Sequence, residues 1–440
     1  MSCKLITHKI FITFLVIFFI CYGKAVTAVE NPSVTGITIQ EKEGAPEITA
    51  PHTQMKQQQV KQEDKTSAFS FAVGAPDLNA IGCVLPLSGR YGDNGNKALD
   101  AILLATGMFD EKNRTSWKIV AADSRGLPEG GPAAVAHLAK TQNVIAIITV
   151  AGATEAMEMA READRWKIPI ILITAKEGVT SSNQYAFQHF LTPSQQIGAL
   201  TKYALDNLKC AIFSILYPKD DYGIEMVKTI RAQATRIGGK VERAIPYSKT
   251  QTDFSEEIYK LSGYGIDAAK KIPANKVETK VRVSVDFEAL FIPDSYQRVR
   301  MITSQLAFYD VKGFRLLGTS LWNSPDLLKK GAEYLEGAVF ADSFFVNSFY
   351  PETNDFVDIY YTGYSREPEN IEALAYDTAK MIISVLKDKN IQTREQFIAG
   401  LQQLENYRGA TGNTSFSGGR VATKTAFILQ VKNGKLEQVK

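Results

Sequence analysis

The chain has 440 residues, and 45% of its side chains are apolar, 10% aromatic and 22% charged. These proportions are typical of a globular protein that is long enough to bury the cores of about two or three domains. Lysine and arginine total 50 against 47 aspartate and glutamate residues. This near balance produces no strong field of either sign, which argues against nucleic acid or an anionic membrane as the main partner.

The N-terminus has the pattern of a signal peptide. Lys4 and Lys9 precede an apolar run at residues 10–21, in which Thr13 is the one polar residue, and small side chains follow at residues 26–28. The run of about 12 residues is shorter than the roughly 20 that a membrane-spanning helix needs. We therefore predict a signal peptide at residues 1–28, a mature chain that begins near Val29 without a transmembrane span, and a periplasmic location. An uncleaved membrane anchor is the alternative.

Four cysteines bear on lipidation and on disulfides. Lipidation at Cys21 would need a small residue directly before it, and Ile20 stands there instead, which argues against a lipid anchor. Cys3 and Cys21 both lie in the segment expected to be removed, so Cys83 and Cys210 remain in the mature chain. Each lies in an apolar, strand-like run. We predict two buried thiols, which lie in different lobes of the fold predicted below, with a disulfide between them as the alternative.

Residues 29–76 are rich in Gln, Glu, Lys, Thr and Pro, with no aromatic residue before Phe69. Such a segment buries too little apolar surface to offset the entropy of ordering it. We predict a disordered tether here and a single globular region at residues 77–440.

From residue 77 onward, apolar strand-like runs alternate with segments of helical period. The predicted strands are residues 81–87, 117–122, 144–150, 168–174, 210–217, 240–246, 289–292 and 315–317. The predicted helices are residues 95–109, 131–141, 154–166, 194–208, 223–237, 253–261, 296–309, 371–386 and 393–404. A hairpin is predicted at residues 425–431 and 435–439, because Asn433-Gly434 between them is a strong turn signal.

This alternation predicts the α/β fold class, with two doubly wound parallel-sheet lobes. That three crossing segments join the lobes is implied by the resemblance described below. Lobe 1 would comprise about residues 77–190 and 345–412, and lobe 2 about residues 194–340 and 416–440. Between the last helices of lobe 2, residues 262–286 are basic and mostly polar. They predict a solvated surface insertion, and a partner-binding flap is the alternative.

Motifs of enzyme chemistry are absent from the sequence. Its four histidines, His8, His52, His137 and His189, lack the spacing of metal ligands. The sequence also lacks a nucleophile elbow, a Walker loop and a G-x-G-x-x-G segment after a strand. We therefore expect no catalytic residue, no metal site, no cofactor and no enzymatic activity.

The run at residues 81–92, Ile-Gly-Cys-Val-Leu-Pro-Leu-Ser-Gly-Arg-Tyr-Gly, resembles type I periplasmic binding proteins of the leucine/isoleucine/valine-binding group. The resemblance covers about residues 79–440 and continues in several later segments. These are residues 168–171, 216–223, 252–255, 337–340 and 375–377. It implies three crossing segments near residues 190–193, 341–346 and 412–416. The ligand would contact loops at the carboxyl ends of the strands, which the switch-point rule for open α/β sheets also predicts.

By this resemblance the candidate ligand-binding residues lie in loops of both lobes. They are Ser88, Tyr91, Gly92, Ala151, Thr154, Ala175, Lys176, Glu177, Tyr217, Tyr222, Ser320 and Trp322. Free N–H groups at the start of the helix at Gly95 would favour an anionic ligand group. The loops 151–154 and 175–178 match family loops that hold the carboxylate and ammonium of an amino acid. Alternative interpretations remain at two places. Ser88-Gly89 also fits an ordinary tight turn, and Tyr217 and Tyr222 also fit positions in the core of lobe 2.

The sequence departs from the family pattern at two places. Lys176 and Glu177 replace small and hydroxyl residues, and Ser320 stands where a carboxylate would meet the ammonium of an amino acid. Lys176 and Glu177 therefore either pair with a different zwitterion or close an empty cleft.

Two functions follow from this pattern. The first is an exported solute-binding protein that captures a small polar, amino-acid-like ligand in an interlobe cleft for import by an ABC-type permease. The second is a regulatory module that binds a protein partner, since similar domains occur in activators of penicillin-binding proteins, which are cell-wall synthases. The tether, the basic insertion and the altered loops favour the second function.

Overall fold

The computed structural model describes residues 75–109, 117–262 and 285–439. The predicted signal peptide, nearly all of the predicted tether and most of the basic insertion lie outside these residues. Within the described ranges, no helix combines the length and the apolar character that crossing a membrane requires.

Lobe 1 is built on a sheet of five parallel strands in the order β2-β1-β3-β4-β5. The strands are β1 (Asp77–Leu85), β2 (Lys118–Asp123), β3 (Val144–Val150), β4 (Ile170–Ile173) and β5 (Ala186–Gln188). The helices of this lobe are α1 (Gly92–Ala105), α2 (Gly130–Thr141), α3 (Ala153–Trp166), α9 (Pro351–Tyr364), α10 (Asn370–Leu386) and α11 (Arg394–Gln402).

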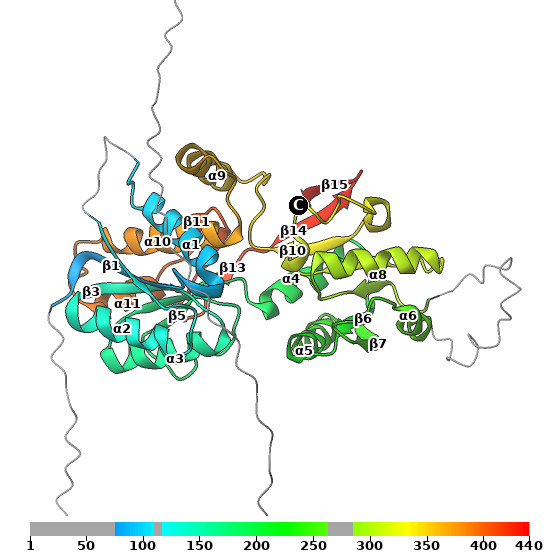
Figure 1. The fold of residues 1–440 in the computed structure, drawn as a ribbon, viewed down its shortest axis with the longest axis horizontal. Coiled ribbons are helices and arrows are strands. Elements are labelled where there is room, and N and C mark those ends of the chain that lie inside the picture. The colour runs from blue at the N-terminus through cyan, green and yellow to red at the C-terminus, as the bar shows by residue number, and fades with distance from the viewer. Residues whose placement is uncertain (1–74, 110–116, 263–284, 440) are drawn as a thin grey trace, which may run out of the picture. The chain divides into compact units, whose positions relative to one another are not determined.

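Both faces of this sheet are buried, as continuous apolar strands predict. Along β1, Ile81 and Cys83 point to the core that α1 and α10 cover, whereas Ala80 and Val84 point to the core that α2 and α3 cover. Figure 1 shows these two pairs of helices on opposite faces of the sheet. The alternation follows from the two-residue period of a strand.

Lobe 2 is built on a mixed sheet of seven strands in the order β15-β14-β10-β9-β8-β6-β7. The strands are β6 (Ile212–Pro218), β7 (Lys240–Tyr247), β8 (Ala289–Phe291), β9 (Arg315–Gly318), β10 (Val339–Asp342), β14 (Phe427–Lys432) and β15 (Lys435–Val439). The helices are α4 (Pro193–Asp206), α5 (Asp221–Arg236), α6 (Ser255–Leu261) and α8 (Tyr296–Phe308), with short 3-10 turns η2 (Ser320–Trp322) and η3 (Ala332–Leu335).

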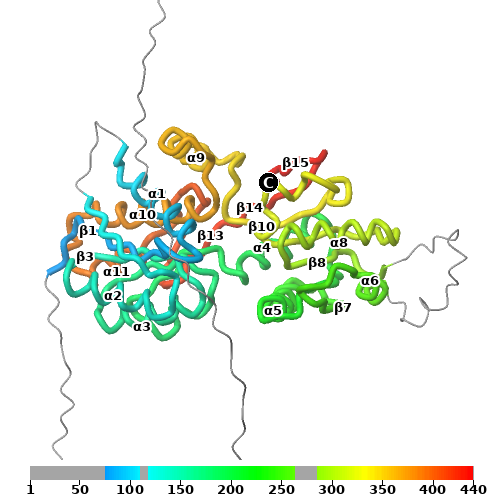
Figure 2. The backbone as a smooth tube through the Cα atoms, viewed as in Figure 1, coloured from blue at the N-terminus to red at the C-terminus, as the bar shows by residue number. Residues whose placement is uncertain are grey.

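The sheet of lobe 2 is parallel except at the C-terminal hairpin, which forms one of its edges. β14 runs antiparallel to β10 and to β15, and Figure 2 shows the C-terminal β14 beside β10, far from it in the sequence. The predicted Asn433-Gly434 hairpin is confirmed. Both residues take positive φ angles, 52° and 68°, which a tight hairpin turn requires and which asparagine and glycine tolerate.

The chain passes between the lobes at three segments. The first leads from β5 to α4, and the second follows β10, where Phe344 packs into the core of lobe 1 and Phe345 into that of lobe 2. The third was expected at residues 412–416 but lies later. Residues up to Ala422 pack against lobe 1, and Phe427 packs against lobe 2.

The reason for this shift is a small three-stranded sheet that the sequence did not predict. Its strands are β11 (Tyr407–Gly409), β12 (Gly412–Ser415) and β13 (Thr423–Lys424). Phe416 directly follows β12 and stacks edge-on against Phe187 of β5, with ring centroids 5.4 Å apart. The segment therefore stays with lobe 1.

Cys83 and Cys210 are both buried free thiols. The prediction that they do not pair is confirmed. Cys83 lies in β1 of lobe 1, and Cys210 packs in the core of lobe 2.

Candidate ligand-binding site

The loops that follow the strands of lobe 1 surround a pocket of about 410 Å³. Because β1 lies between β2 and β3, the connections after β1 and β3 diverge here, and such a switch point is where open α/β sheets bind ligands. The residues that line the pocket are Pro86, Tyr91, Asn94, Gly126, Pro128 and residues 150–155. It thus brings together three of the predicted ligand-binding residues, Tyr91, Ala151 and Thr154.

The N-terminus of α3 opens into this pocket. Its N-cap residue is Gly152, and no side chain caps the first turn. Among the described residues, no atom lies within 4 Å of the position that a Cβ on Gly152 would take. Backbone N–H groups and the helix dipole make such an end attractive to an anion. The loop 151–154 before it is one of the two loops that the family resemblance predicted to hold the carboxylate and the ammonium of an amino acid.

Glu155 also lines the pocket, in the first turn of the same helix. Its side chain is buried, and its Oε1 atom has no hydrogen-bond partner among the described residues. Burial raises the pKa of this carboxyl above its usual value, although a hydrogen bond with the Ser124 side chain opposes the rise. The sequence analysis did not single out Glu155, because nothing in the sequence shows that it is buried without a partner.

The first cleft loop differs from its prediction. Ser88 Oγ donates to Asp123 Oδ2 at 2.6 Å, and the backbone N–H groups of Leu87 and Ser88 donate to Asp123 Oδ1 at 2.9 and 3.3 Å. Desolvation opposes the ionisation of Asp123, but these hydrogen bonds hold the pKa of its carboxyl below the usual value. The two N–H groups and the Ser88 hydroxyl of this loop are therefore engaged by a carboxylate of the protein itself.

The helix after this loop, α1, begins at Gly92 and not at Gly95. Gly92 is buried there. A Cβ on Gly95 would lie 2.1 Å from the carbonyl oxygen of Pro86, so only glycine allows the helix to pack this closely on the loop.

The second predicted loop is exposed at Ala175, Lys176 and Glu177. Glu177 accepts hydrogen bonds from the N–H and the hydroxyl of Ser194, at 2.9 and 3.0 Å, in the first turn of α4. Among the described residues, no ion pair joins Lys176 to Glu177. Glu177 therefore caps the first helix of lobe 2 and does not close a cleft by pairing with Lys176.

In lobe 2 the predicted residues follow β6 and β9. Tyr222 is 39% exposed and lies next to Asp220, which caps α5 by accepting from the N–H of Gly223 at 2.7 Å. Tyr217 is half-buried against the core of this lobe. Ser320 opens the turn η2 after β9 and is half-buried.

Trp322 does not face solvent, which corrects its assignment as a ligand contact. Its side chain is fully buried, and Nε1 donates to the carbonyl of Ile292 at 3.1 Å. A Cβ on Gly318 would lie 2.2 Å from the indole ring. The tryptophan thus folds back over the end of β9 and belongs to the core.

The second crossing segment carries a carboxylate that the sequence analysis also missed. Asp342 accepts from the side-chain amide of Asn323 in lobe 2 at 2.8 Å, and from that of Asn370 in lobe 1 at 2.6 Å. Burial raises the pKa of Asp342 to about 7, with these hydrogen bonds opposing the rise. One side chain therefore holds groups from both lobes together.

The third crossing segment carries a buried lysine. Lys424 Nζ donates to His189 Nε2 at 2.9 Å and to the hydroxyls of Thr411 and Thr414 at 2.8 and 2.9 Å. Thr411 in turn donates its hydroxyl proton to Asp377. Burial lowers the pKa of His189 well below its usual value, and the Lys424 charge adds to this, so the imidazole stays neutral and accepts from the ammonium.

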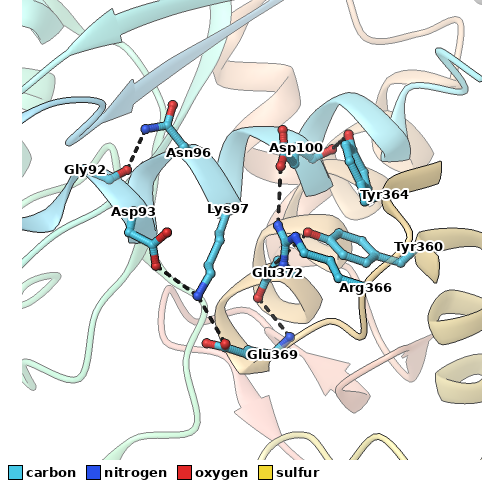
Figure 3. A network of polar contacts seen from close by, with 10 residues as sticks. All are labelled: Gly92, Asp93, Asn96, Lys97, Asp100, Tyr360, Tyr364, Arg366, Glu369 and Glu372. Atoms are coloured by element: carbon cyan, nitrogen blue, oxygen red, sulfur yellow. Dashed lines mark hydrogen bonds and ion pairs between the residues drawn. The ribbon is translucent and has the colours of Figure 1, made fainter.

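A further polar network fixes α1 on α10 (Figure 3). Lys97 on α1 pairs with Asp93 at 2.9 Å and with Glu369 at 3.1 Å. Arg366 reaches both Asp100 on α1 and the buried Glu372 on α10. These pairs hold α1 against α10 within the scaffold of lobe 1.

The comparisons with known proteins agree with this fold. The family model for periplasmic binding proteins matches residues 80–435. No curated protein matches the chain in sequence.

Several solved structures share the fold. The leucine-binding protein of Thermotoga maritima is 21% identical, with a TM-score of 0.60 over 82% of this chain and 97% of that one. The branched-chain amino acid substrate-binding protein of Streptococcus pneumoniae, solved with isoleucine, is 20% identical, with a TM-score of 0.60 over 82% and 99%. A solute-binding protein of Rhodopseudomonas palustris, solved with 3,4-dihydroxybenzoic acid, is 18% identical, with a TM-score of 0.61 over 82% and 95%.

Proposed function

The chain belongs to the periplasmic binding protein family, and from this premise we propose that it is an exported solute-binding protein for ABC-type import. Its ligand is a small polar, amino-acid-like molecule held in the cleft between the lobes. The observation that carries the proposal is the pocket at the switch point of lobe 1, into which the uncapped N-terminus of α3 opens.

The ligand carboxylate lies at the N-terminus of α3. The N–H groups of the first turn and the Thr154 hydroxyl donate to it, and the helix dipole favours its charge. Relatives of this fold were solved with isoleucine and with 3,4-dihydroxybenzoic acid, which both carry a carboxylate. Two other helix ends next to predicted site residues are less suited to this role, because Asp220 caps α5 and Glu177 engages α4.

The apolar part of the ligand is covered by aromatic side chains from the two lobes. Tyr91 is 48% exposed and lines the pocket, and Tyr222 is 39% exposed after the first strand of lobe 2. Closure of the lobes on the ligand would bring Tyr222 onto it and would be the signal that a permease recognises.

Isothermal titration calorimetry of the purified protein tests this function. The panel contains the common amino acids together with benzoate and 3,4-dihydroxybenzoate. We expect one member or a related group to bind, and Thr154→Ala to weaken that binding about tenfold or more through the lost hydrogen bond to a charged group.

The matched control is Thr141→Ala. Thr141 is the last residue of α2 and does not line the pocket, and its hydroxyl donates to the carbonyl of His137. This change should leave affinity unaltered. Absence of binding by the whole panel would reject the solute-binding role and favour the regulatory, partner-binding function.

A further inference from the structure

Glu155 is the unexplained group of the lobe 1 pocket. Its side chain is more than nine-tenths buried, yet Oε1 has no hydrogen-bond partner among the described residues. Within the described part of the chain, no lysine, arginine or histidine lines the pocket, and none of the ion pairs includes Glu155. Buried carboxylates are normally paired or hydrogen-bonded on both oxygens, because an unmet one costs free energy.

The position of this carboxyl restricts what the pocket accepts. Glu155 lies two residues after Ala153, the first residue of α3, so it shares the pocket with the helix end that attracts an anion. A ligand that brought only a carboxylate would place two like charges side by side in a site without a protein cation, and each charge would disfavour the other. A ligand that carries a cationic nitrogen next to its carboxylate satisfies both the helix end and Glu155.

We propose that Glu155 is the specificity-determining residue for the ligand, and that it selects carboxylates that also carry a primary ammonium group. This inference rests on the proposed solute-binding function and names its substrate class. The ligand ammonium donates to the Glu155 carboxylate, while the ligand carboxylate accepts hydrogen bonds from the N–H groups of α3. The amine-binding carboxylate is thus supplied by α3 in lobe 1, whereas Ser320 in lobe 2 has no charge to offer.

The packing of Glu155 supports a fixed position for its carboxyl. A Cβ on Gly131 in α2 would lie 3.0 Å from Glu155 Cγ and 2.8 Å from Met159. The stem of the glutamate is therefore held between α2 and α3, and its carboxyl remains at the pocket. A group held in advance loses little conformational entropy when a ligand arrives.

The test compares each amino acid that binds with the same molecule lacking its amine. The pairs include leucine with 4-methylpentanoate and phenylalanine with 3-phenylpropanoate, and affinities are measured by calorimetry. For wild type we expect the amine-bearing member to bind about tenfold or more tightly, the size of a hydrogen bond between charged groups. In Glu155→Gln this ratio should fall toward one, mainly because the amine-bearing member loses affinity.

The control is Glu158→Gln on the same helix, where Glu158 pairs with Arg161, and it should leave the ratio unchanged. If Glu155→Gln does not fold, as judged by circular dichroism, the wild-type ratios alone decide. Equal or tighter binding of the amine-free acids, or an unchanged ratio in Glu155→Gln, overturns the inference while leaving the solute-binding function in place. Binding of neither class overturns the solute-binding function itself.

Discussion

We predict that Lys424 makes the free energy of unfolding increase with pH in the alkaline range. Its fully buried ammonium is held by His189, Thr411 and Thr414. Burial lowers the pKa of Lys424 from 10.5 to about 8, and the charge of Asp377 opposes part of the fall. At about 1.4 kcal/mol per pKa unit, this fall means that burying the charged ammonium destabilises the folded state by about 3 kcal/mol.

The sign of the effect follows from proton binding. Between pH 8 and pH 10.5 the unfolded chain keeps the proton on Lys424 while the folded chain releases it. The unfolded state therefore binds more protons, so stability rises with pH across this window. Lys424→Met has no such group. The free energy of unfolding of wild type minus that of Lys424→Met should increase by about 2 kcal/mol from pH 8 to pH 10.

Equilibrium urea unfolding at pH 7, 8, 9 and 10, followed by tryptophan fluorescence, measures this difference. Titrating groups that do not interact with Lys424 are common to the two proteins and cancel in the subtraction. A difference that stays constant or shrinks with pH would refute the assignment of a buried ammonium to the third crossing segment.

Two further substitutions separate the ligand site from the scaffold. Tyr222→Ala should weaken ligand binding by about 1 to 3 kcal/mol, the range for a lost aromatic contact. The control, Tyr361→Ala on the exposed face of α9, should leave ligand binding unchanged. Equal affinities for wild type and Tyr222→Ala would show that Tyr222 is not part of the site. Arg366→Ala should lower the free energy of unfolding by about 3 kcal/mol, because it leaves the buried Glu372 carboxylate without its cation. It should leave ligand affinity intact. An unchanged melting transition would contradict the role of this pair.

The order of strands and helices could be predicted because its signals are local. Runs such as residues 144–150 are continuous and β-branched, and their burial on both faces is what a parallel sheet requires. The prediction failed where pairing or packing is non-local. α9 buries only Thr353, Phe356 and Tyr360, too narrow a stripe to stand out in the sequence, and β12 is a polar segment that depends on β11 and β13 for its hydrogen bonds.

The candidate site could be located but not resolved from the sequence. The loops after β1 and β3 were predicted to face the ligand because parallel strands present their carboxyl ends at one edge. Which side chains remain free at that edge depends on partners far away in the sequence. Ser88 and Asp123 are 35 residues apart, and Glu177 and Ser194 are 17 apart.

The carboxylates near the ligand edge of the two lobes differ mainly in whether groups of the protein already donate hydrogen bonds to them. Asp123 ends β2, and Asp220 and Glu177 lie in loops that follow strands. Each accepts a hydrogen bond from a backbone N–H, which belongs to a loop for Asp123 and to the first turn of a helix for Asp220 and Glu177. A carboxylate used in this way stabilises the loop and is not available to a ligand, because its lone pairs are occupied. Glu155 lies beside an uncapped helix end and has an oxygen left over. The missing partner, and not the residue type, therefore distinguishes the carboxylate that a ligand would meet from those that build its surroundings.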